Sequence, residues 1–447
     1  MERKKRFAWM VCSLAVPVAL QSMLQSSFSI IDQIMIGQLG SVRVAGVGLA
    51  GKFSSIYSVL ASAIGAIAGI MLSQYLGQKN KQEVRRSFYL NLLIVTIIAA
   101  VFTFLCILFP RQIMGLYTQD HETILAAASY LVMIAGTFLP IAGATLLSTL
   151  FRCMEKASLP LYASIIAAVL NTGLNYVLIF GKIGFPAMGA DGAAIATLIS
   201  QVANLLIMLL LFWKYKDILT SDPSADGGIA KFNWSQYAAM LLPILICEFM
   251  WSLGENVYAG IYGHLGTESC AAMTLTNPVQ GLMIGALCGL SQAASVIVGK
   301  RLGTGEYDEA YSASKKLILY GLIGSLFLSA VILFTKAYYV EIYQVEASVK
   351  MLATQILTSY AIVAPFKVLN MILGGGIIRS GGKTAYVMAI DLIGTWVFGV
   401  PLGLLTAFVF RLSIPYVYFI LSLEECIRFG ISVVVFRRKH WMQILKS

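Results

Sequence analysis

Long apolar blocks recur along the whole sequence, and they constrain the fold more than any other feature. Each block has about 20 residues or more, which as a helix is long enough to cross a hydrocarbon core of about 30 Å. Of the 447 residues, 58% are hydrophobic and only 12% are charged, against about a quarter charged in ordinary soluble domains. The sequence therefore predicts an all-α integral membrane protein.

We assign twelve of these blocks as transmembrane helices. The apolar run that follows the basic first residues has no small-residue cleavage site, so we expect it to be retained as the first span rather than removed as a signal peptide. The approximate bounds of the twelve spans are 8–36, 44–75, 87–109, 124–151, 158–180, 189–213, 236–262, 268–299, 313–334, 349–378, 384–408 and 413–436.

The distribution of basic residues predicts the orientation. With the N-terminus inside the cell, 23 of the 32 Lys and Arg residues fall in cytoplasmic segments. This is the positive-inside bias, so both termini are expected in the cytoplasm and the chain in a bacterial cytoplasmic membrane. The net charge of +11 then reflects topology, and we expect no nucleic-acid partner.

The sequence carries no pattern typical of an enzyme. Its seven cysteines are scattered without a CxxC pair, so neither a disulfide framework nor a zinc site is expected. No metalloprotease, nucleophile-elbow or kinase signature is present, and His and Cys do not cluster. We expect no catalytic residues and no cofactor other than a coupling ion.

The second half of the chain repeats the first. At an offset of 226 residues, glycines and prolines coincide, and the loop phrase IGQLGS matches YGHLGT. We therefore predict two six-helix bundles, 1–213 and 236–447, joined by a cytoplasmic linker at 214–235. The coincident residues include Pro17 with Pro243, Gly37 with Gly263, Leu39 with Leu265, Gly40 with Gly266 and Gly77 with Gly303.

Six helices per copy is an even number, so the two copies are parallel repeats related by a pseudo-two-fold axis along the membrane normal. In such transporters the substrate lies between the halves, and access alternates as the halves rock. A symmetric scaffold or channel is the alternative. The ionisable residues argue against it because they break the repeat: at the same offset Asp32 falls on Tyr258, and Glu248 falls on Ser22.

A charge at the centre of a bilayer costs about 2.5–3.5 kcal/mol on insertion scales, so each intramembrane charge suggests a function. Asp32 in the first span, Asn171 and Asn175 in the fifth and Thr197 in the sixth are predicted at similar depth, with Gln25 on the same face as Asp32. Their oxygens predict a pocket for H⁺ or Na⁺. The alternative is that the two asparagines and the threonine only link helices by hydrogen bonds.

The seventh span carries a second acidic face. Glu248 and Glu255 are two helical turns apart with Trp251 between them, which suits an organic cation through charge and cation-π attraction. Asp391 in the eleventh span is similar. The alternative is that Lys or Arg residues on neighbouring helices hold these acids. Glu424 and Arg428, at i and i+4, are expected to form an internal ion pair of structural importance.

These residues resemble the multidrug and toxic compound extrusion (MATE) family, and the wording is most similar to a bacterial subgroup of multidrug exporters. The resemblance covers nearly the whole chain, through PVALQSMLQ, DQIMIGQLG, NTGLNYVLIFGKIGFPAMGADGAAIATLISQ and EFMWSLGENVYAGIYGHLG. It implies a cation pocket at Gln25, Asp32, Asn171 and Thr197. Some members have an aspartate where this chain has Asn175, which weakens the case for Na⁺ relative to H⁺.

The resemblance implies antiport, in which an organic cation leaves as H⁺ or Na⁺ enters. The helix 7 glutamate of one branch of the family falls on Trp251, so Glu248 and Glu255 are displaced neighbours of that position. A lipid-linked oligosaccharide flippase of the same superfamily is the alternative function, and the intramembrane Lys52 and Lys367 are consistent with it. We expect a monomer whose partners are cationic drugs and the lipid bilayer.

Overall fold

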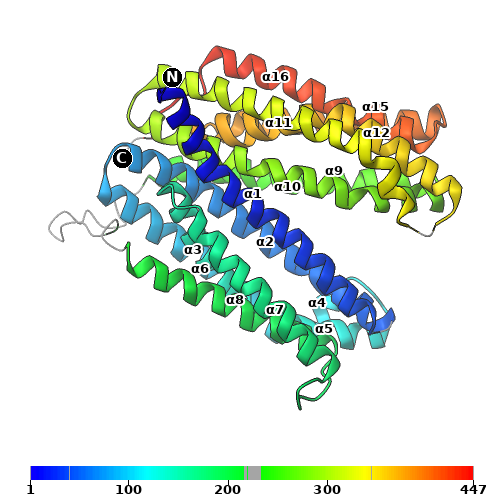
Figure 1. Cartoon of the computed structure of the whole chain (residues 1–447). Coiled ribbons are helices and arrows are strands. Elements are labelled where there is room, and N and C mark those ends of the chain that lie inside the picture. The colour runs from blue at the N-terminus through cyan, green and yellow to red at the C-terminus, as the bar shows by residue number, and fades with distance from the viewer. Residues whose placement is uncertain (1, 40, 216–218, 220–232, 344, 446–447) are drawn as a thin grey trace. The chain divides into compact units, whose positions relative to one another are not determined.

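The computed structural model describes residues 2–39, 41–215, 219, 233–343 and 345–445, and in this part the secondary structure is entirely helical (Figure 1). The predicted all-α fold class is confirmed. The helices of the first half are α1 (Glu2–Gly37), α2 (Ser41–Gly77), α3 (Lys81–Leu108), α4 (Pro110–Gly115), α5 (His121–Ala135), α6 (Phe138–Cys153), α7 (Ser158–Phe180) and α8 (Ala190–Trp213).

The second half contains both α-helices and π-helical stretches, the latter labelled η. Its elements are α9 (Trp234–His264), α10 (Thr267–Gly303), α11 (Tyr307–Glu341), α12 (Ala347–Asn370), η4 (Met371–Ile378), α13 (Thr384–Leu392), η5 (Ile393–Gly399), α14 (Val400–Leu404), η6 (Leu405–Val409), α15 (Ile414–Ser422) and α16 (Glu424–Arg438).

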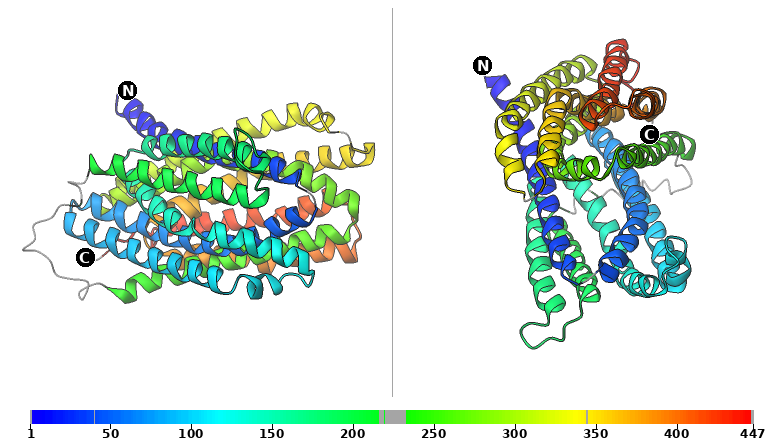
Figure 2. Two further views of the ribbon diagram at one scale, coloured as in Figure 1. Left: turned by 90° about the horizontal axis from the view of Figure 1, so that it is seen from below. Right: turned by 90° about the vertical axis from the view of Figure 1, so that its right-hand side faces the viewer.

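The chain divides into two compact units, each described here by itself. The N-terminal unit is Leu20–Phe232, and the C-terminal unit is Met1–Ala19 together with Asn233–Ser447. This division differs from the predicted one because the first half of α1 groups with the C-terminal unit. The predicted linker at 214–235 lies mostly outside the described residues. Within the units, α7 packs beside α8 and α11 beside α12 (Figure 2).

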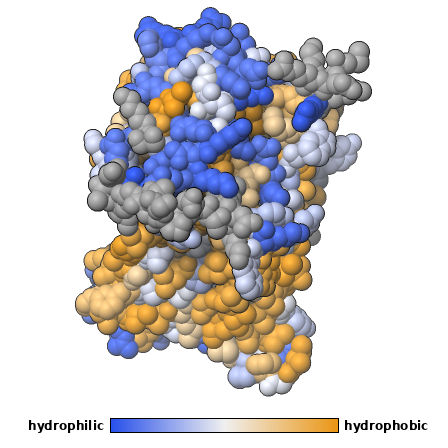
Figure 3. Space-filling model, turned by 90° about the vertical axis from the view of Figure 1, so that its left-hand side faces the viewer, coloured by the Kyte–Doolittle hydropathy of each residue, from blue (hydrophilic) through white to orange (hydrophobic). Residues whose placement is uncertain are grey.

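In the described residues, ten helices are long and apolar enough to cross a membrane, and the pair α5 and α6, bent by 45°, makes an eleventh span. The predicted span 413–436 is divided at Leu423 into α15 and α16, each too short to pass this test alone. Hydrophilic side chains gather over part of the face that carries both termini in Figure 1, and hydrophobic ones lie beyond them (Figure 3).

The helix bounds repeat the offset found in the sequence. α10 begins and ends 226 residues after α2, at Thr267 and Gly303 against Ser41 and Gly77, and α11 begins 226 residues after α3. α13 likewise begins 226 residues after α7. The repeat read from the glycines is therefore also a repeat of helices.

The symmetry is lost where α7 has its counterpart. The regular 23-residue helix α7 corresponds to a succession of short α-helical and π-helical stretches from α13 to η6. Two glycines of this region lie against charged side chains: a Cβ on Gly394 would collide with the Arg428 side chain, and one on Gly399 would collide with Glu424 and Tyr258. π-Helical turns occur frequently at functional sites, and here they accompany a buried ionic cluster.

The first half of α1 packs closely on α10 within the C-terminal unit. A Cβ added to Gly289 would collide with the backbone carbonyl of Ala15, whereas one added to Gly281, on the same helix, would meet nothing within 4 Å. Backbone cannot move aside as a flexible side chain can. The pair therefore offers a matched test of this contact.

We expect Gly289→Ala to destabilise the protein by about 1–3 kcal/mol through overpacking. Gly281→Ala should be neutral or stabilise it by up to about 1 kcal/mol, because alanine favours helix over glycine. Thermal unfolding of both variants in detergent measures the difference. Equal stability of the two variants would show that α1 does not approach α10 at this position.

Candidate functional site

The first polar cluster lies in the N-terminal unit, where α1, α7 and α8 bring together four residues predicted from the sequence. Asn175 Nδ2 donates a hydrogen bond of 2.7 Å to Asp32 Oδ1. Asn175 Nδ2 also lies 3.3 Å from Asn171 Oδ1, and Asn171 Nδ2 lies 3.3 Å from Thr197 Oγ1. The four side chains thus form one connected chain of hydrogen bonds that ends on a carboxylate.

Burial makes this cluster selective for what it can bind. Asn175 is 1% exposed and Asn171 is 8% exposed, while Asp32 is half-buried. The carbonyl oxygen of Asn175 is buried and has no hydrogen-bond partner in the described structure. An unpaired buried acceptor beside a carboxylate favours a proton donor or a small cation.

The Asn171 amide fits the cluster in two orientations. In one, its Oδ1 faces the Asp32 carboxyl group, which requires a proton or cation between the oxygens. In the other, its Nδ2 lies 3.3 Å and 3.2 Å from the two carboxylate oxygens of Asp32, and its Oδ1 accepts from the Thr197 backbone N–H at 3.3 Å. Rotation of one amide therefore matches the cluster to either a neutralised or a charged Asp32.

Gln25 occupies a different position from that of the cluster. It lines a cavity of about 500 Å³ in the N-terminal unit, and it makes no hydrogen bond to Asp32 in the described structure. In the same cavity Gln21 Nε2 donates to Ser164 Oγ at 2.8 Å, and Arg152 lies 3.4 Å from Gln21 Oε1. Sequence reasoning did not predict this cavity or Tyr130, a buried α5 residue near enough to sense the charge of Asp32.

The second polar cluster lies in the C-terminal unit and is centred on Arg428. Its guanidinium group lies 3.5 Å from Glu424, 3.9 Å from Glu425 and 3.7 Å from Asp391. It also donates a short hydrogen bond to Thr395 Oγ1. The predicted Glu424–Arg428 ion pair is confirmed, but it belongs to a larger cluster in which three carboxylates surround one cation.

Each carboxylate of the Arg428 cluster has a further donor. The Tyr258 hydroxyl donates to Glu424 Oε2 at 2.6 Å, and Asn370 Nδ2 donates to Glu425 Oε2 at 2.8 Å. The Cys247 thiol donates to Asp391 Oδ2 at 2.9 Å. Tyr258 occupies the repeat position of Asp32, so the C-terminal unit has a phenol where the N-terminal unit has an acid, and the acid lies on α16 instead.

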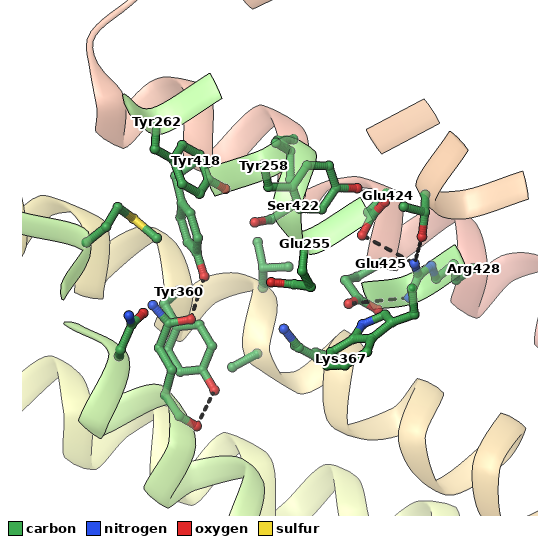
Figure 4. Close-up of a pocket in the computed structure, with 18 residues that line it drawn as sticks. Glu255, Tyr258, Tyr262, Tyr360, Lys367, Tyr418, Ser422, Glu424, Glu425 and Arg428 are labelled. Carbon is green, nitrogen blue, oxygen red and sulfur yellow. Dashed lines mark hydrogen bonds and ion pairs between the residues drawn. The ribbon is translucent and has the colours of Figure 1, made fainter. Parts of the chain in front are cut away.

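Two cavities in the C-terminal unit adjoin the Arg428 cluster. One has a volume of about 110 Å³ and is lined by Trp251, Glu255 and four tyrosines (Figure 4). The other, of about 290 Å³, is lined by Glu248, Trp251 and Asp391. The two cavities share the lining residues Trp251, Lys367, Glu425 and Arg428.

The predicted acids of helix 7 therefore face cavities in the structure, although their surroundings differ. Glu248 lies 3.9 Å from the guanidinium of Arg379, as expected if it is held by a neighbouring base. Glu255 forms no ion pair among the described residues. Lys367 and Arg379 are cavity residues that the sequence argument did not combine with the acids, because nothing in their spacing relates α12 and η4 to α9.

Together these features define an integral membrane protein of two repeated helical units, each with an ionisable cluster inside its spans. The family model described as MatE matches residues 17–177 and 243–405, once in each half. The chain therefore belongs to the MatE family.

Relatives of known sequence and structure agree with this assignment. The chain is 22% identical over 404 residues to a "Probable multidrug resistance protein NorM" of Thermotoga maritima, covering 90% of this chain and 86% of that protein. It is 25% identical to the "Multidrug and toxin extrusion protein 2" of Mus musculus, covering 99% of this chain and 76% of that protein. The crystal structure of the Vibrio cholerae MATE transporter VcmN has the same fold, with a TM-score of 0.90 at 17% identity over 99% of this chain and 100% of that chain.

Proposed function

We propose that the chain is a secondary active multidrug efflux transporter that exports organic cations in exchange for H⁺ or Na⁺, and that it is not an enzyme. Its membership in the MatE family and the names of its relatives from Thermotoga maritima and mouse support drug export. The basic residue distribution supports a bacterial cytoplasmic membrane with both termini inside.

The observation that carries the coupling is the position of Asp32. It is a half-buried carboxylate in a span, bonded to a buried asparagine whose own carbonyl oxygen lacks a partner. Such a group can gain or lose one positive charge, H⁺ or Na⁺, with Asn171 and Thr197 supplying further oxygens. Gln25 lines the neighbouring wide cavity of the same unit.

The substrate cation is assigned to the cavities of the C-terminal unit. Trp251 offers an aromatic face, and Glu248, Glu255 and Asp391 supply negative charge. Ion and substrate then favour opposite states of the protein, which is reciprocal linkage. One charge moving through about 100 mV supplies about 2.3 kcal/mol, enough for roughly a fifty-fold substrate gradient at about 1.4 kcal/mol per tenfold.

The charges of these cavities favour drug export over the transport of a lipid-linked pyrophosphate. The walls of the two cavities carry five acids and only three bases. A multiply charged anion would meet net repulsion there. The acids are Glu248, Glu255, Asp391, Glu424 and Glu425, and the bases are Lys367, Arg379 and Arg428.

Everted membrane vesicles that contain the protein test the proposal. We expect ethidium to accumulate in the vesicles when a pH gradient or a Na⁺ gradient is imposed, and the gradient that works identifies the coupling ion. Vesicles without the protein are the control. Failure of both gradients to drive ethidium would contradict the proposal, and ATP-dependent uptake in the presence of ionophores would replace it.

A further inference from the structure

Most charges of the cavity in Figure 4 already have partners inside the protein. Arg428 is balanced by Glu424 and Glu425, and these two acids also accept hydrogen bonds from Tyr258 and Asn370. Burying a charge is costly unless it is paired and hydrogen-bonded. These side chains therefore form the built wall of the cavity and have little capacity left for a ligand.

Two charges of opposite sign remain. Lys367 on α12 and Glu255 on α9 both line the cavity, and within the described part of the chain neither forms a hydrogen bond or an ion pair. Figure 4 shows the Lys367 side chain extending into the space between Tyr360 and Glu255. A cationic ligand would satisfy Glu255 but would be repelled by Lys367, and an anionic ligand would have the reverse problem.

The rest of the cavity favours an aromatic ligand. Tyr258, Tyr262, Tyr360 and Tyr418 line it together with Trp251. Flat rings of this kind bind other rings by stacking or edge contacts and attract cations by their faces. The adjoining cavity of about 290 Å³, which shares Lys367 and Trp251, gives a ligand room to extend.

We propose that this cavity is a binding site for small aromatic zwitterions, with the anionic group of the ligand at Lys367 and its cationic group at Glu255. The proposal rests on the proposed function, because it names a class of substrate for the same transporter. A dipolar ligand satisfies both unpaired charges at once and leaves the Arg428 cluster undisturbed.

Equilibrium binding to the purified full-length protein tests the site without any ion gradient. The probe is 4-(aminomethyl)benzoate, which carries an ammonium and a carboxylate on opposite sides of one ring. Its matched cation is 4-(aminomethyl)benzamide, and its matched anion is 4-(acetamidomethyl)benzoate. We expect isothermal titration calorimetry to show the zwitterion binding at least tenfold more tightly than either matched compound.

Variants assign the two charges to their residues. Lys367→Gln should weaken zwitterion binding at least tenfold and leave the matched cation unchanged or better bound, whereas Lys367→Arg should retain zwitterion binding. Glu255→Gln should weaken the zwitterion equally but spare the matched anion. Lys336→Gln is the control for a half-buried lysine of the same unit, since Lys336 donates to Thr358 at 2.6 Å and does not line the cavity.

Each outcome decides the proposal. Tighter binding of the cation than of the zwitterion, or unchanged zwitterion binding in Lys367→Gln, would overturn it. Because the comparison of the three ligands uses the wild-type protein, an unfolded variant does not prevent a decision. Gradient-driven ethidium uptake by the same wild-type preparation shows separately whether the proposed function holds, so the two failures can be told apart.

Discussion

Asp32→Asn is expected to reduce gradient-driven ethidium transport at least tenfold, within the roughly 5-fold to 150-fold range typical of coupling between two sites. Asparagine has nearly the same shape as aspartate and can still bond Asn175, which lies 2.7 Å from the carboxylate. It cannot take up and release a positive charge. The initial rate of uptake in everted vesicles measures the effect.

Asp191→Asn is the matched control for this substitution. Asp191 is an acid of the same unit, in the first turn of α8, and it accepts hydrogen bonds of 3.0 and 3.1 Å from Ser129. It has no contact with the Asp32 cluster among the hydrogen bonds of the described structure. We expect this variant to transport ethidium at close to the wild-type rate. A wild-type rate in Asp32→Asn would show that Asp32 is not the coupling acid.

Arg428→Met should give the largest loss of stability, about 3–5 kcal/mol, because removing one partner of a buried ion pair leaves the other charge uncompensated. Here three carboxylates lie within 3.9 Å of the guanidinium group. The Arg428 side chain is also buried against Gly394. Thermal unfolding in detergent measures the loss.

Lys350→Met makes the same change at an ion pair on the surface of the same unit. Lys350 lies 2.8 Å from Glu341, whose side chain is 72% exposed. Exposed pairs contribute up to about 1 kcal/mol, so this variant should lose little. If Arg428→Met were as stable as Lys350→Met, the Arg428 cluster would not be a structural element of the C-terminal unit.

Helix regularity explains what could be predicted. Spacing along a helix places Asn171 and Asn175 on one face, and counting residues from the outer loops places Asp32 and Thr197 at the same depth. The structure has all four in hydrogen-bond contact. The repeat could be recognised because glycines at close packing positions tolerate few replacements, and the bounds of α2 and α10 follow the same offset.

Packing between distant helices could not be predicted in the same way. The bonds from Asn370 to Glu425 and from Tyr258 to Glu424 join residues 55 and 166 positions apart. The π-helical stretches also change which side chains share a face, so the α-helical period fails from η4 to η6. The first half of α1 was placed with the wrong unit for a related reason, since its apolar pattern does not identify the helix it packs against.

Ion release on substrate binding tests the central claim most directly. Ethidium is added to the detergent-solubilised protein in weakly buffered solution, and protons are measured with a pH indicator, or ²²Na⁺ by retention on the protein. Reciprocal linkage predicts that ethidium binding releases one of these ions from wild type and that Asp32→Asn binds ethidium without release. Ethidium binding to wild type with no release of either ion would contradict the claim that Asp32 couples ion and drug.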